Sequence, residues 1–301
     1  MSEKIETENT MQKKAFIYII LAGILWGTSG LFVDFLTPMG LSALQITAIR
    51  GIVSAICMSI YALICDKKLF KASVKEILCY ILSGFAIFAT SACYFISMKE
   101  SSVSTAVVLM YTAPILVMIF SVLFLGEKFT PIKLVSLILV MCGSCLVSGI
   151  IGDFKYSAKG ILFGFGAGVS YSTYNIITKI EMRHKSNPIS ASMYSFIFMA
   201  GFSILFSNAI EIGEVAVIVP LSAIAMLLCG LCTCVMPYFL YTLSLKSLPV
   251  GTAASLGIVE PMAATLFSIT LLGEKLGVYT TIGIVLILAA VFLLSKTTNE
   301  E

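Results

Sequence analysis

The chain has 301 residues, of which 59% are hydrophobic and only 12% are charged, and its mean hydropathy is +1.03. Soluble domains carry about 25% charged residues, so this composition excludes a soluble fold and indicates an all-α integral membrane protein. The formal net charge of +3 is small and its basic residues are scattered, which excludes a nucleic-acid partner.

Ten apolar segments follow one another along the chain. A helix needs about 20 apolar residues to cross a bilayer, and charged or Pro/Gly-bearing breaks divide the sequence into ten such stretches. The first is longer than the core of a secretory signal, so we expect it to be a retained helix. Tails of residues 1–14 and 296–301 flank the predicted spans, which are 15–36, 42–65, 75–98, 102–125, 131–150, 159–180, 189–209, 219–244, 250–272 and 278–295.

The distribution of Lys and Arg predicts the orientation of these spans. With the amino terminus inside, the cytoplasmic segments hold 14 basic residues, the opposite side holds 4, and Arg50 lies within a span. Because cytoplasmic loops are enriched in Lys and Arg, both termini are predicted to be cytoplasmic.

A duplication relates the two halves of the chain. Residues 94–128 and 241–275 align without a gap at an offset of 147, with 14 of 35 positions identical, including Pro114/Pro261 and the closing Leu-Gly-Glu-Lys. We therefore predict two repeats of five spans, 15–150 and 151–295. Five is odd, so the second repeat enters the membrane from the opposite face. Inverted repeats around a central cavity suit a transporter that alternates between inward-open and outward-open states.

Glu260 is the strongest candidate for a functional residue. A charge inside the bilayer costs at least about 2.5 to 3.5 kcal/mol, and Glu260 lies about ten residues into its span, near the midplane. Its repeat partner is Ala113, although the adjacent prolines match. We expect the carboxylate to bind substrate or a coupling proton; the alternative is a protonated side chain that hydrogen-bonds to a neighbouring helix.

Arg50 is the only cation in the interior of a predicted span, since the other cations within span bounds lie at span ends, and its depth differs from that of Glu260 by about one helical turn. Either the two side chains pair, or they divide a zwitterionic substrate, with its carboxylate on Arg50 and its ammonium on Glu260. A structural arginine that snorkels or caps a helix end is the alternative. Asp34 is assigned to the interface, with a vestibule as its alternative role.

Uncharged polar and aromatic side chains supply the expected cavity lining. Such a lining suits a small organic molecule rather than a bare ion, although small residues also serve helix packing. The prolines free backbone carbonyls near Met110 and Gly257, which a cavity could use. The candidate lining residues are Trp26, Asn175, Tyr94, Tyr111, Tyr174 and Tyr238.

The Leu-Gly-Glu-Lys endings are assigned to structure, because a glycine ends a helix and long charged side chains reach water. They comprise Glu127, Lys128, Glu274 and Lys275.

Enzyme chemistry, metals and cofactors are not expected. The nine cysteines are odd in number and nearly all lie in apolar segments, so we interpret them as inert thiols without a disulfide framework. The single histidine, His184, lies among loop charges, which leaves no catalytic or metal-binding set. No G-x-x-x-x-G-K-[ST] run is present, so no nucleotide is expected.

The expected partners are a small-molecule substrate and the lipid bilayer. The chain is expected to be a monomer or a homodimer.

Several stretches resemble the EamA family of the drug/metabolite transporter superfamily. They are "GILWGTSGLF", "ALQITAIRGIVSA", "APILVMIFSVLFLGEK" and "EPMAATLFSITLLGEK", and the resemblance extends from about residue 15 to residue 294, once per half. It implies an inner-membrane carrier of small metabolites; similar proteins export aromatic amino acids, threonine and homoserine, or cysteine metabolites, and others carry sugars and nucleotide sugars. It also implies that the fifth helix of each half packs outside the cavity.

The expected function is therefore secondary-active export of amino acids or similar metabolites by alternating access, with proton coupling through Glu260 as one form of it. The alternatives are a carrier for an organic cation or drug, a sugar or a nucleoside, and a membrane accessory or sensor protein.

Overall fold

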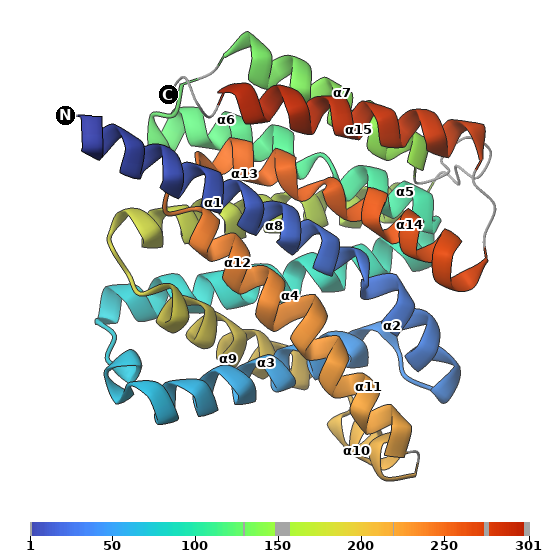
Figure 1. Cartoon of the computed structure of the whole chain (residues 1–301). Helices are drawn as coiled ribbons and strands as arrows, with labels where there is room; N and C mark the ends of the chain where they lie inside the picture. Colours follow the sequence, from blue (N-terminus) through green and yellow to red (C-terminus); the bar gives the residue numbers. More distant parts are fainter. Residues whose placement is uncertain (1, 129, 148–156, 219, 274–276, 298–301) are drawn as a thin grey trace.

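A computed structural model of the chain describes residues 2–128, 130–147, 157–218, 220–273 and 277–297, which contain helices and no strand (Figure 1). In chain order the elements are α1 (Ser2–Gly27), α2 (Ser29–Leu36), η1 (Thr37–Met39), α3 (Ala43–Cys65), η2 (Lys67–Phe70), α4 (Val74–Glu100), α5 (Val103–Met110), α6 (Ala113–Leu125), α7 (Pro131–Val147), α8 (Ala158–Arg183), α9 (Pro188–Phe206), α10 (Ala209–Ile218), α11 (Pro220–Gly230), the π-helical turn η3 (Leu231–Val235), α12 (Met236–Ser244), α13 (Val250–Gly257), α14 (Val259–Leu272) and α15 (Val278–Thr297).

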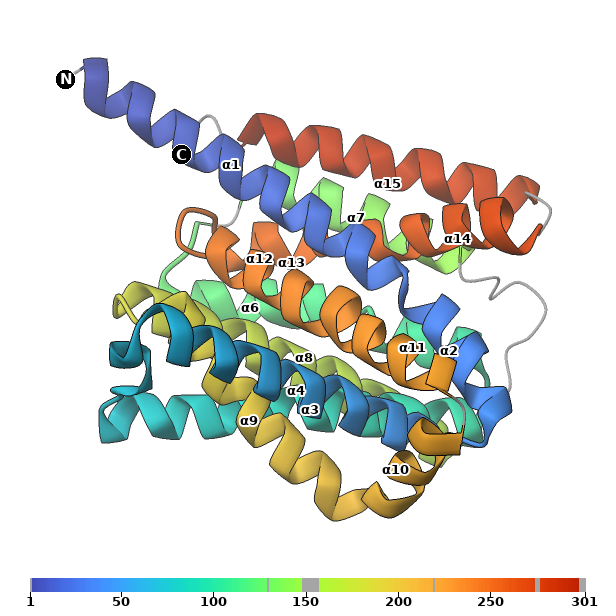
Figure 2. The ribbon, with the colours of Figure 1, turned by 60° about the horizontal axis from the view of Figure 1, so that its bottom comes forward.

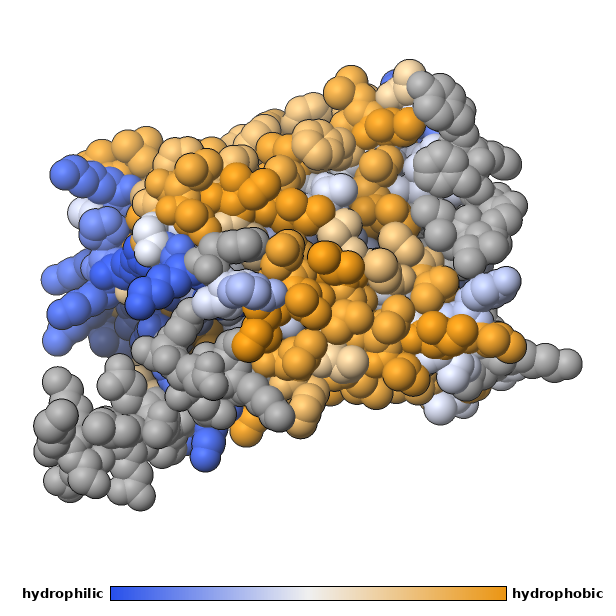
Figure 3. All heavy atoms as spheres, turned by 90° about the horizontal axis from the view of Figure 1, so that it is seen from above, coloured by the Kyte–Doolittle hydropathy of each residue, from blue (hydrophilic) through white to orange (hydrophobic). Residues whose placement is uncertain are grey.

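Helices occupy each of the ten predicted segments. Seven helical stretches in the described residues are long and apolar enough to cross a membrane, counting helices interrupted by a short break as one, and two shorter apolar helices cover Pro131–Val147 and Val278–Leu294. Hydrophilic side chains gather at the end of the molecule where α1 begins, and an apolar band follows them (Figure 3). The chain is therefore a multi-pass membrane protein.

Local sequence signals set many helix ends. Ser42 and Ser73 each close a capping box with the residue three positions later, Gln45 and Glu76, which satisfies backbone N–H groups that have no partner inside the helix. Glycine ends α6 and α14: Gly126 and Gly273 have φ of 63° and 72°, a backbone conformation that side chains disfavour. The predicted role of these glycines is confirmed.

The helices α7 and α15 lie together along one edge of the molecule (Figure 1). Their backbones approach closely at two glycines, so that a Cβ atom added to Gly143 would lie only 2.8 Å from the carbonyl oxygen of Gly283. Their outer faces expose side chains such as Ile138 and Val285. This placement agrees with the expectation that the fifth helix of each half is peripheral.

Four predicted spans are interrupted rather than continuous. The fourth breaks at Tyr111–Thr112 and the ninth at Ile258, each just before a proline, because proline cannot donate the hydrogen bond that would continue the preceding turn. The eighth widens into a π-helical turn before Pro237. The first breaks at Thr28, whose hydroxyl donates to the Leu25 carbonyl oxygen at 2.7 Å.

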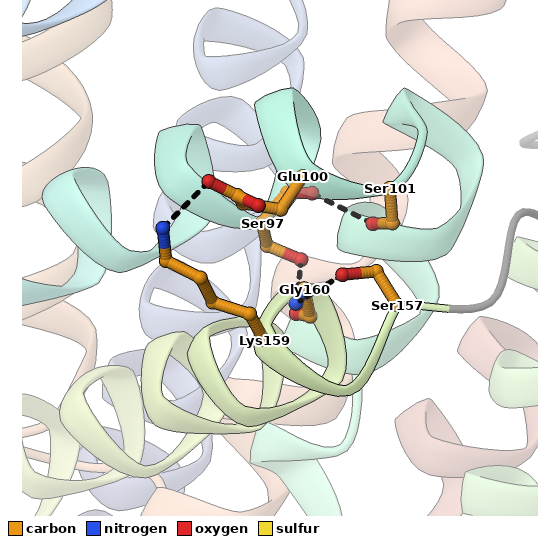
Figure 4. Close-up of polar contacts among 6 residues, drawn as sticks. All are labelled: Ser97, Glu100, Ser101, Ser157, Lys159 and Gly160. Atoms are coloured by element: carbon orange, nitrogen blue, oxygen red, sulfur yellow. Dashed lines mark hydrogen bonds and ion pairs between the residues drawn. The ribbon is translucent and has the colours of Figure 1, made fainter.

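The carboxyl end of α4 is joined to the amino end of α8 (Figure 4). Ser97 Oγ donates to the Gly160 carbonyl oxygen at 2.7 Å, and Lys159 Nζ lies 2.7 Å from Glu100 Oε1. The ion pair is partly exposed, so its contribution to stability is at most about 1 kcal/mol. The buried Ser97 bond is the more specific link between the two halves.

Candidate functional site

The break between α13 and α14 is covered by α1, which runs beside both helices (Figures 1 and 2). A Cβ atom added to Gly27 would lie 2.8 Å from both Ala263 Cβ and Ala264 N, and one on Gly23 would lie 3.3 Å from the Gly257 carbonyl oxygen. Such approaches leave no room for a side chain. The two glycines, four residues apart, therefore let α1 seat directly on the interrupted backbone.

The break between α5 and α6 is covered in the same way by α8. A Cβ atom added to Gly168 would lie 2.6 Å from Thr112 Oγ1 and 3.4 Å from the Met110 carbonyl oxygen, and Ser172 Oγ donates to the Ala113 carbonyl oxygen at 3.3 Å. Met110 and Gly257 are 147 residues apart and equivalent in the duplication. The carbonyls that we expected a cavity to use are thus packed against a glycine of the other half.

Glu260 lies in the first turn of α14, directly after the break, and its side chain is partly exposed. It interacts electrostatically with groups from five other parts of the fold, which converge on it from both halves of the chain. These groups are Arg50 of α3, Tyr94 of α4, Tyr111 at the α5–α6 break, Tyr171 of α8 and Tyr238 of α12.

The convergence brings together several residues that the sequence predicted. Tyr94, Tyr111 and Tyr238 all interact electrostatically with Glu260, and their hydroxyls make no hydrogen bond to another described residue. A carboxylate with free hydroxyls around it can hold a polar solute or a proton.

Arg50 is anchored to the interrupted eighth span. Its Nη2 donates to the Thr233 carbonyl oxygen at 2.9 Å, inside the π-helical turn, and its Nε is buried without a partner among the described residues. Turns of this kind often mark functional positions. Within the described part of the chain, Arg50 and Glu260 form no ion pair at 4.0 Å or less. We considered that the two side chains pair directly or divide a zwitterionic substrate between them. Direct pairing is absent in this conformation.

An aromatic cluster lies beside the charged pair. The ring of Trp26 meets Tyr238 edge-on at 5.2 Å between centroids and Tyr241 at 5.7 Å, and Tyr174 meets Tyr238 at 5.4 Å. Such pairs pack α1, α8 and α12 together. Trp26 is only 5% exposed, and its indole Nε1 has no hydrogen-bond partner in the part of the chain that the structure describes.

Asn175 lies next to this cluster, with its side chain engaged at both ends. Its Nδ2 donates to the Tyr171 carbonyl oxygen at 2.6 Å, and its Oδ1 accepts a hydrogen bond from the Tyr241 hydroxyl. In this conformation Asn175 links α8 to α12. Its contact with substrate stays a prediction.

Asp34 is exposed and lines a pocket of about 220 Å³ between α2 and α14. The pocket also includes Gly27 and Ser268, so it reaches the face of α14 on which α1 is seated. This position favours the vestibule over the simple interface that we assigned to Asp34.

Three charged side chains hold the opposite end of the bundle together. Glu127 Oε1 accepts from Val250 N at 2.9 Å, which joins the end of α6 to the start of α13. Arg183 Nη1 donates to the Leu125 carbonyl oxygen at 2.7 Å, and Lys179 Nζ donates to the Leu245 carbonyl oxygen at 2.8 Å. These contacts close this end around α6, α8 and α13.

Sequence reasoning missed most of these groups. Lys179 and Arg183, at and just beyond the end of the predicted span 159–180, were not singled out, and Glu127 was interpreted as a side chain that reaches water, yet Lys179 is 8% exposed. Glu181, 3% exposed, accepts a hydrogen bond from Ser83 at 3.1 Å. The Thr233 carbonyl oxygen, which accepts from Arg50, is a backbone atom, so no side chain in the sequence indicates its role. Glu274 and Lys275 lie outside the described residues.

Metal binding has no candidate in the described ranges, where no group of three or more His, Cys, Asp or Glu side chains is placed to hold an ion.

Comparison with known proteins gives consistent matches along the chain. The sequence model of the EamA-like transporter family matches twice, over residues 13–149 and 158–296. The chain is 23% identical over 286 residues to YwfM of Bacillus subtilis (strain 168), named as an uncharacterized transporter, with 95% of each chain covered. It is 29% identical over 214 residues to an uncharacterized transporter of Archaeoglobus fulgidus, covering 70% of this chain and 75% of that protein.

The fold also matches a solved structure. One crystal structure of a protein superposes with a TM-score of 0.80 over 96% of this chain and 98% of that chain, at 16% sequence identity. At this identity the likeness concerns the fold alone.

Proposed function

Since this chain belongs to the EamA-like transporter family, we propose that it is a secondary-active exporter of amino acids or similar small metabolites in the inner membrane. The observation that carries the proposal is the partly exposed Glu260 at a helix break, surrounded by tyrosine hydroxyls and Arg50 from both halves. Interrupted helices in corresponding positions of two repeats are the feature that best indicates a transporter binding site.

The proposed architecture is ten spans in two inverted repeats, residues 15–150 and 151–295, with cytoplasmic tails at 1–14 and 296–301. Two separate family matches and the helix breaks at positions 147 apart support the duplication. The start of α1 and the end of α15 lie at the same end of the molecule (Figure 2). That end also carries exposed Lys67, Lys68, Lys128 and Lys185, as expected of a cytoplasmic face.

Alternating access would proceed around Glu260. In this conformation the basic end is held shut by the backbone contacts of Glu127, Arg183 and Lys179, while the pocket beside Asp34 approaches the site from the other end. Glu260 would bind the substrate ammonium or a coupling proton. A carrier for an organic cation, a sugar or a nucleoside uses the same fold and is the second candidate class.

Counterflow in sealed proteoliposomes tests the proposed function. Vesicles preloaded with an unlabelled amino acid should accumulate the labelled form transiently, and protein-free vesicles should not. Thermal-shift screening against amino acids, polyamines, nucleosides and organic cations selects the solutes. Absence of counterflow with every stabilising solute contradicts the proposal, and chemical conversion of a solute would instead indicate an enzyme.

Removing the carboxylate of Glu127 should loosen the closed end. The N-cap residue of α13 is Pro249, which supplies no capping side chain, so Glu127 is the group that accepts from Val250 N at 2.9 Å. A charge-assisted hydrogen bond contributes about 1.5 to 3 kcal/mol, so Glu127→Ala should raise the opening of this end roughly 10- to 150-fold. Hydrogen exchange of the peptide covering residues 246–256 measures it.

Glu100→Ala is the matched control, because it removes a partly exposed carboxylate from the other end of the molecule. Its exchange in residues 246–256 should equal that of the unmodified protein. Equal exchange in Glu127→Ala would show that Glu127 does not hold this end closed.

A further inference from the structure

Two buried N–H donors in the region of Glu260 have no hydrogen-bond partner among the residues that the structure describes. They are Arg50 Nε, on α3, and Trp26 Nε1, on α1. An unsatisfied buried donor costs about 1 to 3 kcal/mol, and each native case therefore asks for an explanation. A ligand that accepts hydrogen bonds would supply it.

Both side chains that carry these donors interact with the same tyrosine. Trp26 packs edge-on against the Tyr238 ring at 5.2 Å, and Arg50 interacts electrostatically with the Tyr238 hydroxyl. The π-helical turn that precedes Tyr238 contacts both α1 and α3. The two helices thus present their free donors to one region of the interrupted eighth span.

Arg50 cannot turn away from this region without losing its anchor. Its Nη2 donates to the Thr233 carbonyl oxygen at 2.9 Å, which restrains the guanidinium in this region. A carbonyl takes up one of its five N–H groups and neutralises none of its charge. The remaining donors suit an anionic acceptor, and a carboxylate offers two oxygens to such a fork.

We propose that Arg50 Nε and Trp26 Nε1 form a subsite for the carboxylate of the transported substrate. This inference rests on the proposed function and narrows its substrate class to solutes that carry both a carboxylate and an ammonium group. Glu260 interacts electrostatically with Arg50 without pairing to it, so a zwitterion can place its ammonium on Glu260. The negative charge of Glu260 also disfavours a dianion at this place.

Analogues that differ only in the carboxylate test the substrate class. L-Phenylalanine and L-threonine, with the amide and the decarboxylated amine of each, are compared by thermal shift on purified protein and by counterflow. At least one free acid should bind, and its amide and amine should bind at least ten-fold more weakly. Equal binding of acid and amine, or no binding of either acid, overturns the subsite.

Variants assign the donors. Trp26→Phe removes the N–H group and keeps an aromatic ring, and Arg50→Lys keeps the charge and removes Nε. Each should weaken binding of the free acid about ten-fold while leaving the weak binding of the amine unchanged. Equal losses for acid and amine would indicate a merely structural effect and contradict the assignment. Thermal unfolding without ligand establishes that each variant is folded.

Ser136→Ala is the matched control, because the buried hydroxyl of Ser136 also has no partner among the described ranges, but Ser136 lies on the peripheral helix α7. Its ligand binding should be unchanged.

The carboxylate subsite and the proposed transport function can be contradicted separately. Counterflow of the amines alone would overturn the carboxylate subsite but would still support a transport function. Binding of the acids without counterflow would overturn transport and leave the subsite.

Discussion

Glu260→Gln is expected to reduce accumulation driven by a pH gradient at least ten-fold in proteoliposomes. Glutamine has the shape of glutamate but cannot take up or release a proton, and it lacks the charge that holds an ammonium group. Because Glu260 is partly exposed beside the break and is surrounded by hydroxyls, the variant should fold. Labelled-solute uptake with and without the gradient measures the effect.

Glu214→Gln is the control for this experiment, since Glu214 is an exposed carboxylate on α10. Accumulation should be unchanged in it. Two results separate the roles of Glu260. Lost accumulation with retained counterflow assigns Glu260 to coupling, whereas loss of both assigns it to substrate binding. Full accumulation in Glu260→Gln would rule out both roles.

Gly27→Ala should lower the free energy of unfolding by about 1 to 3 kcal/mol, the usual cost of overpacking a well-packed contact. The added Cβ would lie 2.8 Å from the Ala264 backbone nitrogen, and backbone cannot move aside as a flexible side chain can. α1 would have to lift from the helix break beside Glu260. We therefore expect weaker transport as well, measured by thermal unfolding in detergent and by counterflow.

Gly201→Ala provides the contrast, because Gly201 lies inside α9 with nothing within 4 Å of an added Cβ. There the substitution should stabilise the protein by about 0.5 to 1 kcal/mol, since alanine is the better helix former. If Gly27→Ala were as stable as Gly201→Ala, the close packing of Gly27 of α1 against Ala264 of α14 would be contradicted.

The positions of the helices could be predicted from the sequence because they depend on the length of apolar runs. The breaks within them could not, since Tyr111 and Ile258 lie in stretches as apolar as their surroundings. Pro114 and Pro261 were visible in the duplication, and the structure shows that each follows an interrupted turn. Proline alone does not fix whether a helix bends, widens or breaks, because the packed neighbour decides.

Glu260 and Arg50 were predictable because a charge in an apolar run stands out at once. The partner of Arg50 was not, since the Thr233 carbonyl oxygen is a backbone atom exposed by a π-helical turn. Lys179 and Glu127 lie near the ends of predicted spans, where charge is ordinary. Whether such a side chain reaches water or bonds to a distant backbone depends on tertiary contacts, which local sequence does not contain.

Each helix break is covered by a helix of the other half of the chain, and this arrangement has a consequence for how the protein is synthesised and assembled. The α5–α6 break is complete once residue 125 has been synthesised, but Gly168 and Ser172, which cover it, come more than 40 residues later. Conversely, α1 precedes α13 and α14 by more than 200 residues, so it can meet them only after the intervening chain has been synthesised. Neither half can reach its final packing alone, so a truncated first half would leave interrupted backbone facing lipid, where unsatisfied carbonyls are costly. Assembly of this membrane protein is therefore a late, cooperative event rather than the sum of two independent insertions.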